Sequence, residues 1–170
     1  PLLNWMGYST SLELLQAGYY PRGGGRIQAA IRPYTALQPL QVDTLQAVTR
    51  LRGISIVSNL DRSIAERQKR QAVLRLLPYF PDLQVKVEQI NAPSPGTHVL
   101  LKVDHPSASG APLGGCYTAL GERGKPAERV ADEAIDQIIA FTQTRACVDR
   151  FLADQILLPL ALLKTPCWYS

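Results

Sequence analysis

Apolar and polar residues alternate in two short segments near the start of the chain, and we predict that these segments form a hairpin. The alternation covers residues 9–15 and returns over residues 26–32, as in β-strands. Between them, the glycine-rich residues 18–25 interrupt regular structure, which favours a turn. Prolines and polar residues then remove any period over residues 34–45, so we predict a connector or an irregular edge strand there.

The middle of the chain predicts a mixed α/β unit. Its predicted elements are, in order, a strand over residues 53–60, a helix from Ser63 to about Leu77, strands over residues 83–90, 98–103 and 113–120, and a helix that follows Pro126 and keeps apolar spacing to Phe141. Ser63 and Glu66 have the spacing of a capping box, and Pro78 and Pro81 end the first helix. The predicted fold class is therefore α/β (α+β), in the order β-α-β-β-β-α.

A last helix is predicted over about residues 148–158, and it could belong with the first hairpin. We therefore predict that residues 1–49 and 145–170 are two flanks of one incomplete host domain, with residues 50–144 as an inserted small α/β domain. Because Pro1 is not an initiator methionine and no signal-type pattern follows it, we also expect the chain to open within a domain.

Charge gives a modest indication of a polyanionic partner. The formal net charge is +4, and 46% of the residues are hydrophobic, which is enough for a buried core. The cations gather locally, and those between residues 50 and 75 are Arg50, Arg52, Arg62, Arg67, Lys69, Arg70 and Arg75. Only Asp61 and Glu66 oppose them there, so the stretch could steer RNA; the alternative is a solvated helix face.

The three cysteines are widely spaced, which favours a reducing, cytosolic or nuclear compartment and indicates neither a disulfide framework nor a zinc site. The longest apolar run, residues 156–163, is shorter than the roughly 20 residues that cross a bilayer, so we predict a core helix and no membrane segment. His98 and His105 have no nearby partner for a catalytic pair, and we interpret both as structural or surface residues.

Two segments are candidates for ligand binding. Arg22, Gly23, Gly24 and Gly25 could approach a phosphate with backbone amides and one cation, although the same residues could simply form a bend that needs positive φ. In the last helix, Asp154 could contact a ribose or a nucleotide-bound magnesium, Gln155 a base edge and Phe151 a base face. The alternative there is a capped helix with a core phenylalanine.

Five ordered segments resemble RNA 3'-terminal phosphate cyclases. They are Gly18 to Gly25, Arg52-Gly53-Ile54, Asn59-Leu60 with Ile64 to Arg67, Gly121 to Gly124 with Ala127 to Ala131, and Leu152 to Leu162. The resemblance implies a large domain of repeated β-α-β-α-β-β units that carries a smaller inserted domain. It also implies a ligase of RNA processing, which uses ATP and magnesium or another divalent metal to convert an RNA 3'-phosphate into a 2',3'-cyclic phosphate. The implied intermediate is a covalent histidine-AMP, and the implied location is cytoplasmic.

By this resemblance, Phe151, Leu152, Ala153, Asp154 and Gln155 should border the ATP, whereas Arg22 to Gly25 are weaker phosphate or scaffold candidates. No residue matches the nucleophilic histidine of the family, so we assign no catalytic residue, no metal ligand, and expect the chain to be inactive alone. The alternative is a non-catalytic cyclase-like protein that binds RNA or acts in ribosome assembly. Exposed strand edges would allow self-association.

Overall fold

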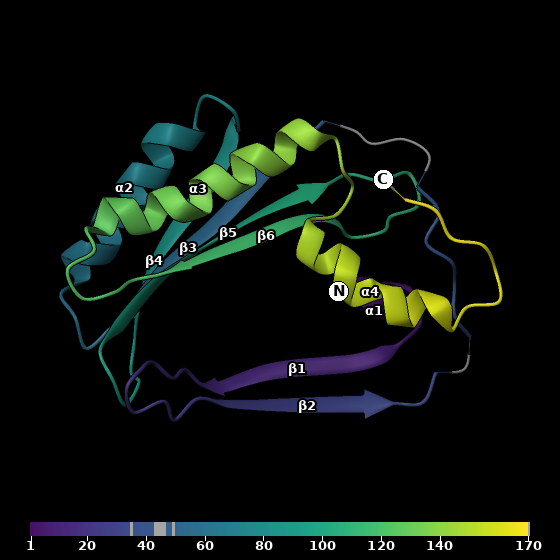
Figure 1. The fold of residues 1–170 in the computed structure, drawn as a ribbon, viewed down its shortest axis with the longest axis horizontal. Helices are drawn as coiled ribbons and strands as arrows, with labels where there is room; N and C mark the ends of the chain where they lie inside the picture. Colours follow the sequence, from purple (N-terminus) through teal and green to yellow (C-terminus); the bar gives the residue numbers. More distant parts are fainter. Residues whose placement is uncertain (35, 43–46, 49, 170) are drawn as a thin grey trace.

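The computed structural model describes residues 1–34, 36–42, 47–48 and 50–169, which form two sheets and four helices (Figure 1). In chain order the elements are α1 (Leu2–Trp5), β1 (Ser9–Gln16), β2 (Arg26–Arg32), β3 (Arg50–Ser58), α2 (Arg62–Leu76), β4 (Asp82–Ile90), β5 (Gly96–His105), β6 (Leu113–Leu120), α3 (Ala127–Thr144) and α4 (Arg150–Ala161). Parts of the predicted connector, at residues 35 and 43–45, lie outside the described residues.

Four strands form one sheet in the order β4-β3-β5-β6. The first pair, β3 and β4, is parallel because α2 crosses between them, whereas β5 and β6 return as antiparallel neighbours. Helices α2 and α3 lie side by side over one face of this sheet (Figure 1). The predicted α/β class and the order β-α-β-β-β-α are confirmed.

The main core lies between this sheet and its two helices. Its members alternate along the strands and recur at helical spacing in α2 and α3, as the sequence pattern predicts. Helix α2 buries Ala65, Ala72 and Leu76, and it also buries Gln68, whose side-chain oxygen accepts a hydrogen bond of 2.6 Å from Ser55. This polar contact connects the helix to the middle of β3.

The predicted capping box of α2 is wrong. The cap is Asp61, whose carboxylate accepts a hydrogen bond of 2.8 Å from the backbone N–H of Ser63. Glu66 instead pairs with Arg62 one turn earlier. An aspartate at the N-cap satisfies the first free amides as well as a serine does. The observed cap therefore lies two residues before the predicted one.

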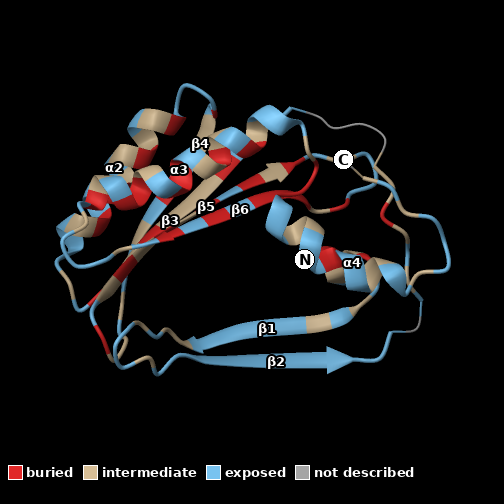
Figure 2. Cartoon of the chain, viewed as in Figure 1, coloured by how far each residue is buried: buried red, intermediate tan, exposed pale blue. Residues whose placement is uncertain are grey.

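The hairpin of β1 and β2 forms a separate two-stranded sheet that is exposed along its length (Figure 2). Cross-strand pairing places Leu12 opposite Ala29 and Leu14 opposite Ile27 on one face. These side chains meet solvent, with 74% of Leu12 exposed. Among the described residues, therefore, nothing covers the apolar face of the hairpin.

A second core joins the two ends of the described chain. It contains Leu2 and Met6 from the α1 region, Leu40, the start of β6 at Leu113, and Ile156 of α4. The predicted domain boundaries at residues 50 and 144 stay a prediction, but residues from both predicted flanks share this core. Among the described residues, no helix is long and apolar enough to span a membrane.

Candidate functional site

Helix α4, which carries the main candidate segment, is fixed at its first turn by Asp149. One carboxylate oxygen accepts hydrogen bonds from the backbone amides of Phe151 and Leu152 at 2.8 and 2.9 Å. The other accepts a bond of 3.0 Å from the amide of Cys116 in β6. Asp149 is only 4% exposed, so one buried carboxylate both caps the helix and attaches it to the sheet.

The five predicted residues divide between two sides of α4. Leu152 packs against the second core, and Ala153 lies partly buried beside it. Phe151, Asp154 and Gln155 are exposed instead, with 47% of the Phe151 side chain accessible. Among the described residues, the side chains of Asp154 and Gln155 have no hydrogen-bond partner. A carboxylate, an amide and an aromatic ring are therefore presented to solvent near the start of the helix.

The alternative of a capped helix with a core phenylalanine is right about the cap, which is Asp149, but wrong about the ring, because Phe151 is exposed and does not occupy a core position. The guanidinium of Arg150 lies over the Phe151 ring, 4.7 Å from its centroid, and Tyr117 meets the ring edge-on with centroids 6.3 Å apart. Burial and the nearby Asp149 carboxylate raise the pKa of the Tyr117 phenol, and Arg150 acts in the opposite direction. The ring is thus held by neighbours from β6 and α4.

A cavity of about 430 Å³ opens beside this segment, between β6, the second half of α3, the start of α4 and the C-terminal residues. Its walls include Tyr117, Phe141 and Tyr169, with Arg150 and Ala153 from α4. Tyr117 and Phe141 are in ring contact at 6.0 Å. The cavity therefore shares Tyr117 and Arg150 with the surroundings of Phe151.

The glycine-rich turn packs against the loop between β4 and β5. The backbone N–H of Arg22 donates a hydrogen bond of 3.1 Å to the Ser94 hydroxyl, and a Cβ on Gly24 would come within 2.8 Å of Pro93. Gly23 and Gly24 have φ of 63° and 77°. These contacts hold the turn against the neighbouring loop, and the assignment of Arg22 to Gly25 as phosphate or scaffold residues stays a prediction.

Tyr19 extends the same contact to the start of β5. Its hydroxyl shares a hydrogen bond of 2.8 Å with Nδ1 of His98, and its ring covers Gly96 so closely that a Cβ there would lie 2.2 Å from a ring carbon. Burial lowers the pKa of His98 and raises that of Tyr19. The hairpin thus docks on the sheet through its turn, and His98 has a structural role.

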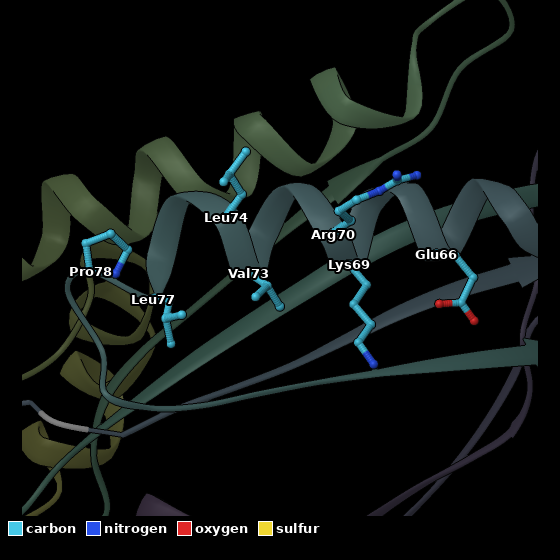
Figure 3. A pocket seen from close by; sticks show the side chains of 7 residues that line it. All are labelled: Glu66, Lys69, Arg70, Val73, Leu74, Leu77 and Pro78. Atoms are coloured by element: carbon cyan, nitrogen blue, oxygen red, sulfur yellow. The ribbon is translucent and has the colours of Figure 1, made fainter.

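The basic stretch between residues 50 and 75 is largely neutralised by acids. Arg50 and Arg52 pair with Asp82, Arg62 with Glu66, Arg67 with Glu128, and Arg75 with Asp132 and Asp136. In the described part of the chain only Lys69 and Arg70 of this stretch have no ion-pair partner. They leave α2 in different directions beside Val73, Leu74 and Leu77, which line a shallow groove with them (Figure 3). The stretch therefore offers much less free charge to RNA than its composition suggests.

The remaining titratable groups form no metal centre among the described residues, since no three histidines, cysteines or carboxylates gather there. His105 is buried against Phe141, with ring centroids 5.7 Å apart. Cys116, Cys147 and Cys167 form no disulfide. Neither described histidine is placed as an exposed nucleophile beside Phe151.

Sequence reasoning missed Asp149, Arg150 and Tyr117. Asp149 had a local signal, because an aspartate directly before an apolar helix is a favoured N-cap. The contact of Tyr117 with Phe151 joins residues far apart in the chain, and no local pattern reports it. Figure 1 shows the reason, since the start of α4 lies beside β6.

Comparison with known proteins identifies the family. Residues 44–143, more than half of the chain, match the family model described as RNA 3'-terminal phosphate cyclase (RTC), insert domain. The chain belongs to the RNA 3'-terminal phosphate cyclase family. The resemblance predicted from the five sequence segments is thereby confirmed.

Curated relatives with the name RNA 3'-terminal phosphate cyclase match nearly the whole chain. The protein of Pyrobaculum aerophilum is 38% identical over 164 residues, covering 96% of this chain and 46% of the relative. The corresponding values are 33%, 94% and 45% for Pyrococcus furiosus, and 35%, 100% and 46% for Methylococcus capsulatus. The chain thus spans less than half the length of these cyclases.

Proposed function

We propose that this chain forms part of an ATP-dependent RNA 3'-phosphate cyclase, and that Phe151, Asp154 and Gln155 border the nucleotide. The observation that carries the proposal is their joint exposure on α4, although the neighbouring Leu152 and Ile156 are withdrawn into a core. Membership of the cyclase family supports it. An exposed ring beside two polar groups without protein partners suits a ligand that has both a base and a ribose.

The chemistry of the three side chains fits an adenine nucleotide. The Phe151 ring offers a stacking surface, and Arg150 and Tyr117 limit its rotation. Asp154 accepts hydrogen bonds, as from a ribose hydroxyl, whereas Gln155 both donates and accepts and could read a base edge. Leu152 and Ala153 also belong to the predicted segment, and they pack against the second core. This packing fixes the orientation of the helix, so that Phe151, Asp154 and Gln155 face solvent.

ATP would supply the adenylyl group that activates the RNA 3'-phosphate, and this chain's share is to bind and orient the nucleotide. The described residues offer no cluster of three metal ligands, so we derive no step through a divalent metal. We also assign no nucleophile, because His98 is hydrogen-bonded to Tyr19 and His105 is buried. Inactivity of the isolated chain and a cytoplasmic location stay predictions.

The alternative, a non-catalytic cyclase-like protein that binds RNA, rested mainly on the basic stretch. Pairing of most of those cations with acids weakens that argument. ATP binding distinguishes the two proposals, because only the cyclase proposal requires the exposed side of α4 to bind ATP.

The test measures ATP binding to the 170-residue chain by calorimetry and by the backbone amide chemical shifts. We expect shifts at Asp154 and Gln155, and Phe151→Ala should weaken ATP binding about tenfold, because stacking on an aromatic ring contributes roughly 1–3 kcal/mol per base. Tyr79→Ala, which removes an exposed ring in the turn that follows α2, is the matched control.

A second pair of variants tests the carboxylate. Asp154→Asn should weaken ATP binding, whereas Glu13→Gln, an exposed acid on β1, should leave it unchanged. Equal loss in Phe151→Ala and Tyr79→Ala, or ATP shifts confined to regions away from α4, would overturn the proposal.

A further inference from the structure

The cavity beside α4 is lined by aromatic rings and a cation that do not belong to the proposed ATP contact of Phe151, Asp154 and Gln155. Its walls include the rings of Tyr117, Phe141 and Tyr169, and Arg150 lies at its α4 side. Phe141 and Tyr117 are almost fully buried, so the rings form a fixed wall. A cavity with aromatic walls and a cation suits a planar ligand that also carries negative charge.

Three polar groups in the cavity have no hydrogen-bond partner among the described residues: the hydroxyls of Tyr117 and Tyr169 and the guanidinium of Arg150. By contrast, the Thr144 hydroxyl, which also lines the cavity, donates to the Phe141 carbonyl and accepts from the Ala146 amide. The two phenols and the guanidinium are thus available to a ligand, and the guanidinium presents a planar set of donors that matches a phosphate.

The cavity is adjacent to the exposed side of α4. Arg150 lines the cavity and also lies over the Phe151 ring, and Tyr117 contacts Phe151 edge-on. In the reaction proposed above, the RNA 3'-phosphate must come close to the nucleotide that activates it. Arg150 lies over the Phe151 ring, so a group held at Arg150 would be adjacent to the base of the ATP that the preceding proposal places there.

We propose that this cavity binds the 3'-terminal nucleotide of the RNA substrate, with the base among Tyr117, Phe141 and Tyr169 and the 3'-phosphate at Arg150. The proposal rests on the proposed function, which places ATP on the neighbouring side of α4. Arg150 is then the shared boundary between the two nucleotides.

The test measures binding of the 170-residue chain to a single-stranded RNA hexamer, labelled with fluorescein at its 5' end, by anisotropy. One hexamer ends in a 3'-phosphate and the other in a 3'-hydroxyl. Arg150→Gln should weaken binding of the phosphorylated RNA about tenfold, and Arg150→Lys should weaken it less. Arg129→Gln, which removes an exposed arginine at the other end of α3, should change binding less than twofold.

Comparison of the two hexamers tests whether Arg150 contacts the 3'-phosphate itself. If Arg150 holds the 3'-phosphate, removing the phosphate from the RNA should weaken binding to the wild type about tenfold and should hardly affect Arg150→Gln. Additive losses would overturn the assignment of the phosphate to Arg150. Tyr117→Phe and Tyr169→Phe should each weaken the binding of both RNAs about two- to fivefold, because each variant loses one hydroxyl and keeps its ring.

Amide chemical shifts separate this proposal from the preceding one. RNA should shift Thr144, Ala146 and Val148 around the cavity, whereas ATP should shift Asp154 and Gln155. If ATP instead shifts the cavity residues and excludes the RNA, the cavity is an ATP site and the inference is wrong. If ATP fails to bind while RNA still fills the cavity in an Arg150-dependent way, the proposed ATP contact fails and the cavity assignment stands.

Discussion

The four-stranded sheet buries one face beneath its own helices, whereas the β1–β2 hairpin exposes both of its faces. Both were predicted from the same alternation of apolar and polar residues. In the larger sheet the inward positions, such as Leu101, have no exposure, while the matching positions of the hairpin, such as Ile31, are 79% exposed. Alternation therefore identifies which residues share a face, but it does not tell what covers that face.

The hairpin is instead held at its turn. Tyr19 bonds to His98, and the glycines let the chain approach Pro93 and Ser94 closely. Asn4 of α1 also holds the start of β1, through hydrogen bonds of 2.7 and 2.8 Å with the backbone of Thr10. The stability of the hairpin should thus depend on a few contacts at its ends, and that of the larger sheet on packing along its whole length.

The largest effect should come from the covered sheet. Leu101→Ala removes a fully buried side chain from β5 and should lower the free energy of unfolding by about 3–5 kcal/mol, because it loses apolar burial and leaves a cavity. Leu12→Ala in the hairpin should change it by less than about 0.5 kcal/mol. Urea unfolding followed by circular dichroism measures both, and similar losses would contradict the comparison.

Asp149 tests how α4 is attached to the covered sheet. Asp149→Ala removes the cap of α4 and leaves the partly buried amide of Cys116 without its acceptor, so we expect a loss of about 2 kcal/mol in the same assay. Asp149→Asn keeps one acceptor oxygen and should lose less. If the alanine variant unfolds like the wild type, the double role of Asp149 is wrong.

Gly96→Ala tests the docking of the hairpin. The new Cβ would overlap the Tyr19 ring, so the turn should be displaced at a cost of about 1–2 kcal/mol. Hydrogen exchange should accelerate in β1 and β2 and stay slow in β3. Tyr20→Ala, beside Tyr19 but almost fully exposed, is the control and should leave exchange unchanged.

The smallest effect should appear as a pH dependence. Burial lowers the pKa of His98 below its ordinary value of 6.5, so the unfolded chain binds more protons than the folded chain between the two pKa values. Stability should therefore be complete above about pH 6.5, decrease as the pH falls below it, and level off below the folded pKa. In urea unfolding at pH 8.0 and 5.5, His98→Gln should show a smaller difference than the wild type; an equal difference would exclude His98 as the cause.

Local sequence patterns predicted the structure correctly where the residues that contact one another are also close in sequence. The bounds of β2 and β6 agree with the predicted strands, and the buried side of α3 has the predicted helical spacing. The capping of α2 failed because Asp61 and Ser63 are both good caps, and their choice depends on where the chain turns.

The basic stretch shows the limit more clearly. Counting residues 50–75 gave an excess of cations, but Glu128, Asp132 and Asp136 on α3 neutralise Arg67 and Arg75 on α2. These acids are about 60 positions away in sequence, and only the side-by-side packing of the two helices brings them together. The assignment of Phe151 to Gln155 to ATP came from family resemblance and stays a prediction; what the structure adds is their division between two sides of α4.

The bridge between Gly114 and Val148 has a consequence for how the sheet ends. Gly114 donates to the Cys147 carbonyl and accepts from the Asp149 amide, and the Asp149 carboxylate takes the amide of Cys116. These groups at the open edge of β6 are the ones to which a foreign strand would add. Because the segment that leads into α4 already pairs with these groups, it protects the start of β6 from edge-to-edge aggregation.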